Sequence, residues 1–389
     1  MFKKLAFFCL IFFILFTITP VINGAEFDLS AKSALLMEVK SGEVIFEKNP
    51  ELKLPPASMT KIMTMLLVME AIEDNTVSLT DKIIISERAA SMGGSQVYLE
   101  AGEEMNLEEL MKAVAISSAN DASVAVAEYV YGTEDRFVQK MNERAKELGL
   151  KNTYYYNTNG LPSSDAEIEG NYTTVYDLAR LTREIYKYEK IFKWASIWID
   201  SLRRGEFVLN NTNRLVKHFQ GANGLKTGHT DEAGFCITAT ARRGDLDFIA
   251  VIMGAESSDK RFTEAAKLLN YGFNLFESRE IAIKGEKITA IDIINAKPAR
   301  VDLIADSKLV IPMKKGEKTT IKQKVYLEDN IKAPLEAGER VGELRIYKEN
   351  LLLAKTDLLL AEKVDKIIFY KLWYRKLKLL IMGIFKNIF

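Results

Sequence analysis

The segment from Pro55 to Met69 limits the possible folds of this 389-residue chain more than any other. Its residues 62 to 69 are almost all apolar, contain no glycine or proline, and form a run longer than most strands. This pattern predicts a buried helix. Pro55 and Pro56 fix where that helix begins, because a residue that precedes a proline is kept out of the α region.

Ser58 and Lys61 stand at the start of this helix, three residues apart and therefore on one face. A serine hydroxyl is a poor nucleophile until a base takes its proton, and a lysine is such a base only when burial or a second cation lowers its pKa. The first turn of a helix also offers free N–H groups to a developing oxyanion. The pair predicts a nucleophile and its base, although an N-capping serine and a solvated lysine would have the same spacing.

The first 25 residues have the pattern of a secretory signal peptide. Lys3 and Lys4 precede an apolar run over residues 5–18, and small residues follow at 21–25. An uncleaved membrane anchor is the alternative, and both interpretations place the body of the protein outside the cytoplasmic membrane. Because Cys9 falls in this apolar run, Cys236 is the one cysteine of the mature chain, and we expect a core thiol on a strand rather than a disulfide.

Composition argues against several classes of function. Lys and Arg together number 53, as do Asp and Glu, so the chain as a whole does not have the basic character of a nucleic-acid-binding protein. His218 and His229 are the two histidines, which makes a metal site of the His/Cys type improbable. The sequence has no glycine motif that would cradle a phosphate, and we expect neither a metal nor a cofactor.

The last residues, 362–389, predict an amphipathic helix. Lys371, Arg375 and Lys378 share one face of a helical wheel, and apolar residues including Trp373 occupy the opposite face. Such a helix is typical of a segment that lies in a membrane surface. Docking on the protein itself or on a partner is the alternative, and the charges interrupt the apolar run too early for a membrane-spanning helix.

The central part of the chain divides by pattern into two regions. In residues 26–279 a hairpin at 33–46 and several helices precede two apolar strands, 234–242 and 248–253, which are joined by a turn at Arg243-Gly244-Asp245. The helices are expected at residues 107–116, 122–131, 134–148, 175–188 and 260–276. Residues 280–361 carry short β-type runs separated by turns, which predict a small, sandwich-like β domain.

Three short motifs follow one another along the chain: Ser58-x-x-Lys61, Ser118-x-Asn120 and Lys226-Thr227-Gly228. Each is weak alone, but together, in this order and on a secreted chain, they are similar to those of the penicillin-interacting serine transferases. The chain resembles the low-molecular-mass penicillin-binding proteins, specifically the bacterial D-alanyl-D-alanine carboxypeptidases. The resemblance implies an α/β (α+β) catalytic domain with an antiparallel sheet flanked by helices, followed by a small all-β domain and the C-terminal amphipathic helix.

The motifs suggest a role for each of their polar side chains. Ser58 would attack a carbonyl and form an acyl-enzyme, and Lys61 would take its proton. Lys226 would be the second cation that keeps Lys61 neutral and that attracts an anionic substrate end. Ser118 would relay a proton to the leaving amine, and Asn120 would hold the substrate amide and orient Lys61.

The third motif and its neighbours are expected to bind the substrate. Thr227 would donate to the substrate carboxylate, and Gly228 would let a substrate backbone approach the strand. By resemblance, the backbone N–H groups of Ser58 and His229 form the oxyanion hole. We favour this backbone role for His229 over a role of its imidazole as an acid or base. Arg261 is either a further carboxylate-binding residue or a solvated helix charge, and the loop at residues 93–94 is expected to border the site.

The resemblance implies a serine-type carboxypeptidase that removes the terminal D-alanine of peptidoglycan stem pentapeptides, is acylated by β-lactams, and is held on the outer face of the cytoplasmic membrane. A class A β-lactamase would need a deacylating glutamate, for which Glu167 and Glu169 are poor candidates because their surroundings differ from the usual motif. A DD-endopeptidase or transpeptidase would share the acyl-enzyme. A non-catalytic β-lactam-sensing or wall-binding module is the remaining alternative.

Overall fold

The computed structural model describes residues 27–163, 170–318, 320–367 and 373. The predicted signal peptide, residues 1–25, therefore lies outside the described residues, as do Glu167, Glu169 and most of the predicted C-terminal helix. The first residues of that segment are described and are not helical. Asp365–Lys366 forms a short strand, β18, that pairs with β12 (Ala296–Lys297), because the neighbouring Val364 is fully buried in the core of the β domain.

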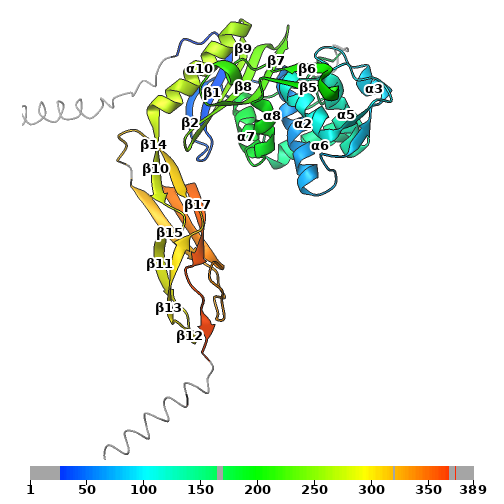
Figure 1. Ribbon diagram of the computed structural model, residues 1–389. Helices are drawn as coiled ribbons and strands as arrows, with labels where there is room; N and C mark the ends of the chain where they lie inside the picture. The colour runs from blue at the N-terminus through cyan, green and yellow to red at the C-terminus, as the bar shows by residue number, and fades with distance from the viewer. Residues whose placement is uncertain (1–26, 164–169, 319, 368–372, 374–389) are drawn as a thin grey trace, which may run out of the picture. The chain divides into compact units, whose positions relative to one another are not determined.

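A five-stranded antiparallel sheet is the centre of the first part of the chain (Figure 1). Its strand order is β2-β1-β9-β8-β7. The strands are β1 (Ser33–Glu38), β2 (Val44–Lys48), β7 (Ala222–Thr230), β8 (Gly234–Arg243) and β9 (Leu246–Ala255). The predicted hairpins are confirmed: β1 pairs with β2, and β8 and β9 are joined at Arg243-Gly244-Asp245.

Helices pack on this sheet. One face is covered by α10 (Ser258–Leu275), which contacts β8 and β9, while α7 (Val175–Ile185) packs against β1 and β9 and α8 (Glu189–Ala195) against β7. The other helices are α2 (Lys61–Glu73), α3 (Glu87–Ala90), α4 (Leu107–Lys112), α5 (Asn120–Tyr131), α6 (Glu134–Glu147) and α9 (Leu215–His218). Two small hairpins complete this part: β3 (Lys82–Ile84) with β4 (Glu104–Asn106), and β5 (Ile199–Leu202) with β6 (Phe207–Asn210).

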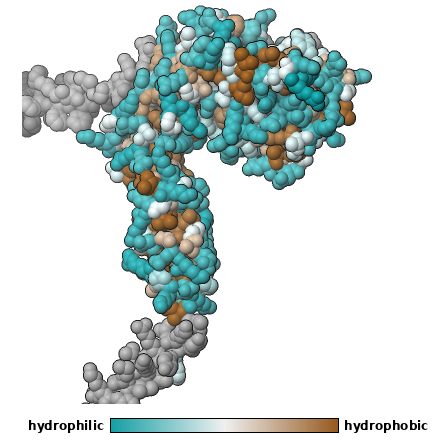
Figure 2. All heavy atoms as spheres, viewed as in Figure 1, coloured by the Kyte–Doolittle hydropathy of each residue, from teal (hydrophilic) through white to brown (hydrophobic). Residues whose placement is uncertain are grey.

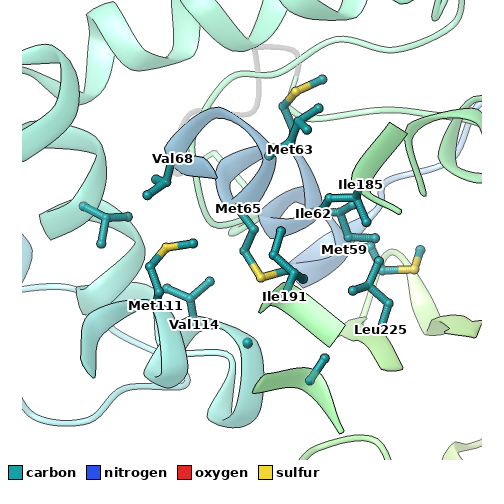
Figure 3. Packing of buried hydrophobic residues seen from close by; sticks show 14 of the residues in the cluster. Met59, Ile62, Met63, Met65, Val68, Met111, Val114, Ile185, Ile191 and Leu225 are labelled. Atoms are coloured by element: carbon teal, nitrogen blue, oxygen red, sulfur yellow. The ribbon is translucent and has the colours of Figure 1, made fainter. Parts of the chain in front are cut away.

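The predicted buried helix is α2, and its apolar residues point in all directions. In Figure 3, Met111 and Val114 lie on one side of this helix and Ile191 and Leu225 on another, with side chains of α2 between them. A helix that is apolar all round is stable only when other elements surround it. The sequence Ile62–Met69 therefore places the start of α2 and Lys61 inside the molecule, with the half-buried Ser58 just before them.

One predicted helix differs from the structure. The segment expected as a single helix over residues 107–116 consists of α4 and a π-helix, η2 (Ala113–Ser117). Asn106 caps α4 as expected, because its side chain accepts a hydrogen bond from the N–H of Glu109. Turns of π-helix are frequent at functional sites, and this one ends directly before Ser118.

Residues from 276 onward form β structure with a core of its own. An antiparallel five-stranded sheet has the order β11-β13-β17-β16-β15, and β10 pairs with β14 in a second sheet. The strands are β10 (Phe276–Ala282), β11 (Lys287–Asp292), β13 (Arg300–Ala305), β14 (Leu309–Lys314), β15 (Ile321–Leu327), β16 (Arg340–Lys348) and β17 (Leu351–Leu360). This confirms the predicted all-β character of the second part.

The surface in the view of Figure 2 is mainly hydrophilic, with apolar side chains in separate patches. Buried apolar residues instead form cores, among them one around α2 and one within the β part. Among the residues that the structure describes, no helix has both the length and the apolar character needed to cross a membrane.

Candidate active site

Ser58 lies in a short 3-10 helix, η1 (Ala57–Thr60), that leads directly into α2. The sequence predicted the first turn of an α-helix; the tighter 3-10 turn brings positions i and i+3 almost into line. Lys61 Nζ lies 3.0 Å from Ser58 Oγ. Ala57, directly before the serine, has φ of +48°, a left-handed conformation that is rare for a residue other than glycine and is concentrated at functional sites.

Lys61 is completely buried, and three oxygens surround its amine. Besides the 3.0 Å contact with Ser58, Nζ lies 2.7 Å from Asn120 Oδ1 and 2.8 Å from the carbonyl oxygen of Asn159. Burial, reinforced by the charge of Lys226, lowers the pKa of Lys61 well below its usual value, and Asp121 opposes this in part. A neutral amine has two N–H donors, which the two carbonyl oxygens accept, so its lone pair is left for the Ser58 hydroxyl proton.

Asn120, the first residue of α5, contacts Lys61, and Ser118 lies two residues before it. Ser118 has φ of +62° and ends the π-helix, and its buried Oγ has no hydrogen-bond partner among the described residues. Such a hydroxyl is available to a substrate atom. Asn120 Nδ2 donates to the carbonyl oxygen of Gly93 at 2.6 Å, which ties the loop expected to border the site to the second motif.

Strand β7 carries the third motif past the nucleophile. A Cβ atom on Gly228 would lie 2.7 Å from the carbonyl oxygen of Pro56 and 3.2 Å from the backbone nitrogen of Ser58, so only glycine lets the strand come this close. Lys226 is almost fully buried, and burial followed by the charge of Arg261 lowers its pKa to about 7. Its Nζ donates to the carbonyl oxygen of Thr227 at 3.2 Å.

The remaining predicted residues lie around the same strand. The imidazole of His229 is exposed and packs on the ring of Phe235, with 4.2 Å between the centroids. Arg261 is not a solvated helix charge: it is buried, and its Nη1 donates to the carbonyl oxygen of Gly228 at 3.1 Å. Burial lowers the pKa of this guanidinium to about 10, which leaves a positive charge behind the strand.

The family of this chain follows from comparison with known proteins. Residues 20–257 match the family described as D-alanyl-D-alanine carboxypeptidase, and residues 276–366 match the C-terminal domain of penicillin-binding protein 5. The chain is 42% identical over 346 residues to D-alanyl-D-alanine carboxypeptidase DacF of Bacillus subtilis, which covers 88% of each chain. The chain belongs to the D-alanyl-D-alanine carboxypeptidase family.

Solved structures of penicillin-binding proteins agree with this family assignment. PBP3 of Streptococcus pneumoniae matches with a TM-score of 0.76 and 26% identity, covering 87% of this chain and 100% of its own. Penicillin-binding protein D2 of Listeria monocytogenes, solved with bound ampicillin, matches with a TM-score of 0.58 and 31% identity over 64% of this chain and 99% of its own. The recognised resemblance and the predicted two-part fold are therefore confirmed.

The sequence motifs missed two contributors to this carboxypeptidase-family site. The carbonyl oxygen of Asn159 accepts from Lys61, but a backbone group leaves no residue-type signature, and only the turn signal Asn159-Gly160 marks the position. Thr212 was also missed. Thr227 Oγ1 donates to Thr212 Oγ1 at 2.7 Å, so the hydroxyl expected to face a carboxylate already has a protein partner that orients it.

Glu134, at the start of α6, holds the segment that carries this carbonyl. Its buried carboxylate accepts from the backbone N–H of Thr158 at 3.2 Å and from its hydroxyl at 2.9 Å, and it pairs with Arg88. The carbonyl oxygen of Thr158 accepts from the hydroxyls of Thr64, at 2.7 Å, and Ser123, at 2.9 Å. The peptide next to Asn159 is therefore fixed from both sides, which determines where the Lys61 amine can lie.

Proposed function

We propose that the protein is a serine-type D-Ala-D-Ala carboxypeptidase that removes the terminal D-alanine from peptidoglycan stem pentapeptides. The family assignment supports the reaction class. The single observation that carries the mechanism is the buried amine of Lys61, held 3.0 Å from Ser58 Oγ by two carbonyl acceptors. A lysine in this environment is a base at neutral pH, and a serine beside it is an activated nucleophile.

Acylation begins when Ser58 Oγ attacks the carbonyl carbon of the penultimate D-alanine while its proton passes to Lys61 Nζ. The carbonyl oxygen becomes an oxyanion, which the N–H groups of Ser58 and His229 stabilise. The intermediate collapses when the C–N bond breaks. Lys61 passes its proton through the Ser118 hydroxyl to the departing amine and is neutral again when D-alanine leaves. Ser58 then carries the ester.

Deacylation reverses these roles with water as the nucleophile. Lys61 takes a proton from the water as the water oxygen attacks the ester carbon. When the C–O bond breaks, Lys61 passes this proton to Ser58 Oγ. The shortened peptide then leaves. A β-lactam reacts at the same atom, but its opened ring remains attached to the acyl group, and we expect the resulting ester to hydrolyse slowly.

Positive charge near β7 suits the carboxylate at the end of the peptide. Lys226 and Arg261 both lie at this strand. Thr212 accepts the one hydroxyl proton of Thr227, so Thr227 donates to the carboxylate once Thr212 donates to Thr227 instead. We assign Lys226 and Thr227 to direct recognition. Arg261 acts as a positioning residue, because its Nη1 contacts the carbonyl oxygen of Gly228.

The test is incubation of the purified protein with a diacylated peptide that ends in D-Ala-D-Ala, followed by measurement of free D-alanine. We expect release that penicillin blocks and that Ser58→Ala abolishes. Penicillin labelling of Ser58 without release of D-alanine would instead favour an enzyme that uses another peptide as acceptor, or a sensor. Rapid turnover of penicillin would favour a β-lactamase.

The protein is further proposed to act on the outer face of the cytoplasmic membrane, after removal of residues 1–25 and with residues 368–389 lying in the membrane surface. This proposal rests on the sequence patterns of the two ends. Deletion of residues 368–389 leaves β18 intact and should move the protein to the soluble fraction with unchanged activity on small peptides. Retention on the membrane after that deletion, with the signal peptide cleaved, would contradict the anchor.

A further inference from the structure

A cavity of about 460 Å³ lies beside the nucleophile. Ala57, which precedes Ser58, and Gly160, which follows the residue whose carbonyl accepts from Lys61, both line it. Thr230, the last residue of β7, lines it as well. None of the roles assigned above uses this cavity. Its lining residues include Lys53, Ala57, Gly160, Tyr172, Thr230 and Glu232.

The direction of the substrate along β7 determines what reaches this cavity. β7 is the edge strand of the sheet in the described residues, and extended peptides bind such edges as an added strand. The proposed carboxylate-binding groups are at Lys226 and Thr227, and the proposed oxyanion hole is at His229. The peptide therefore continues past the scissile bond toward Thr230, about 3.3 Å per residue. The residue before D-Ala-D-Ala arrives at the mouth of the cavity.

The cavity presents opposite charges to that residue. Lys53 and Glu232 are both exposed and both line it. Lys53 Nζ lies 4.6 Å from the centre of the Tyr172 ring, a cation–π contact that keeps the ammonium at the cavity. A side chain that ends in both an ammonium and a carboxylate carries a partner for each of these two charges.

Stem peptides that are cross-linked through a side-chain amide need a residue with a side-chain amine next to the D-alanines. We propose that this cavity receives the side chain of that residue and selects a diamino diacid, with Glu232 accepting from its ammonium and Lys53 pairing with its carboxylate. The inference rests on the proposed function, because the direction of binding follows from the assigned oxyanion hole.

Three peptides test the selection. Each is N-acylated and ends in D-Ala-D-Ala, and the preceding residue is diaminopimelate, lysine or norleucine. Lys53 and Glu232 are both exposed, so each ion pair should raise kcat/KM only about threefold to fivefold. The gain should appear as a lower KM with kcat unchanged. We expect the order diaminopimelate, lysine, norleucine for the unmodified full-length protein.

Two substitutions test the charges of Glu232 and Lys53 one at a time. Glu232→Gln should remove the preference for lysine over norleucine, and Lys53→Gln should remove the preference for diaminopimelate over lysine. Asp231→Asn and Lys151→Gln are matched controls, since both residues are exposed and neither lines the cavity. The controls should keep the full order of preference.

The outcomes distinguish this inference from the proposed function. Release of D-alanine from all three peptides with the same KM would overturn the cavity assignment. The carboxypeptidase assignment would still hold. Preferences that persist in Glu232→Gln and Lys53→Gln would overturn it as well. No release from any peptide, together with no penicillin labelling of Ser58, would overturn both.

Discussion

Replacing Gly160 with alanine should damage the site through the backbone alone. Gly160 has φ of +85°, and a Cβ atom there would overlap the carbonyl group of Ala57 and lie 2.9 Å from Thr60 Oγ1. Neither neighbour is the free end of a flexible side chain. The contact is relieved only if the Ala57 peptide, which is bonded to Ser58, or the Gly160 segment, whose neighbour Asn159 accepts from Lys61, moves by about 1 Å.

The size of the effect follows from two costs. A left-handed conformation costs a residue with a Cβ about 1–2 kcal/mol, and overpacking adds about 1–3 kcal/mol, so stability should fall by about 2–5 kcal/mol. For a domain of this size the melting temperature should drop by roughly 4 to 20 °C. A displacement of about 1 Å at the nucleophile can cost about 100-fold in rate.

The assay is the second-order rate of acylation by a fluorescent penicillin, measured well below the melting temperature of the variant. Gly170→Ala is the matched control, because Gly170 lines the same cavity and, among the described residues other than its chain neighbours, no heavy atom lies within 4 Å of its Cβ position. The control should acylate like the unmodified protein. A folded Gly160→Ala variant that also does so would refute the reasoning.

Two further predictions concern the groups around the Lys61 amine. Lys226→Met removes a cation that helps to lower the pKa of Lys61, so the pKa of Lys61 should rise. The acid limb of the pH profile of the acylation rate should then move to higher pH. An acid limb that does not move would show that burial alone keeps the Lys61 amine neutral. Glu134→Gln weakens the hydrogen bonds that fix Thr158 and leaves Arg88 without its carboxylate partner. We expect the variant to lose about 2 kcal/mol of stability and to melt about 4–8 °C lower. Its acylation should also be slower. Asp135, the exposed neighbour of Glu134, provides the control: Asp135→Asn should change neither the melting temperature nor the acylation rate. Equal effects of the two substitutions would contradict the positioning role of Glu134.

The parts of the fold that the sequence predicted are those with strong periodic or compositional patterns. The apolar run Ile62–Met69 predicted a buried helix because its pattern admits no exposed face. The hairpins followed from turn residues between apolar runs, as at Arg243-Gly244-Asp245. The three motifs could be predicted to form one site because together, in this order, they resemble those of the penicillin-interacting serine transferases.

Features that depend on the backbone could not be predicted in this way. The Asn159 carbonyl that accepts from Lys61 and the left-handed conformation of Ser118 have no residue-type signature. The π-helix over Ala113–Ser117 has the same apolar pattern as an α-helix. Thr212 reaches Thr227 only through tertiary contacts, and β18 forms because Val364 is buried in the β part.

The central claim is that Ser58 becomes an ester during turnover. The most direct measurement is mass spectrometry of the protein quenched in acid during turnover of a thioester or peptide substrate, followed by proteolysis and mapping of the modified fragment. We expect the acyl group to be found on Ser58 and to be lost in Ser58→Ala. D-alanine release that persists in Ser58→Ala, or an acyl group on any other residue, would contradict it.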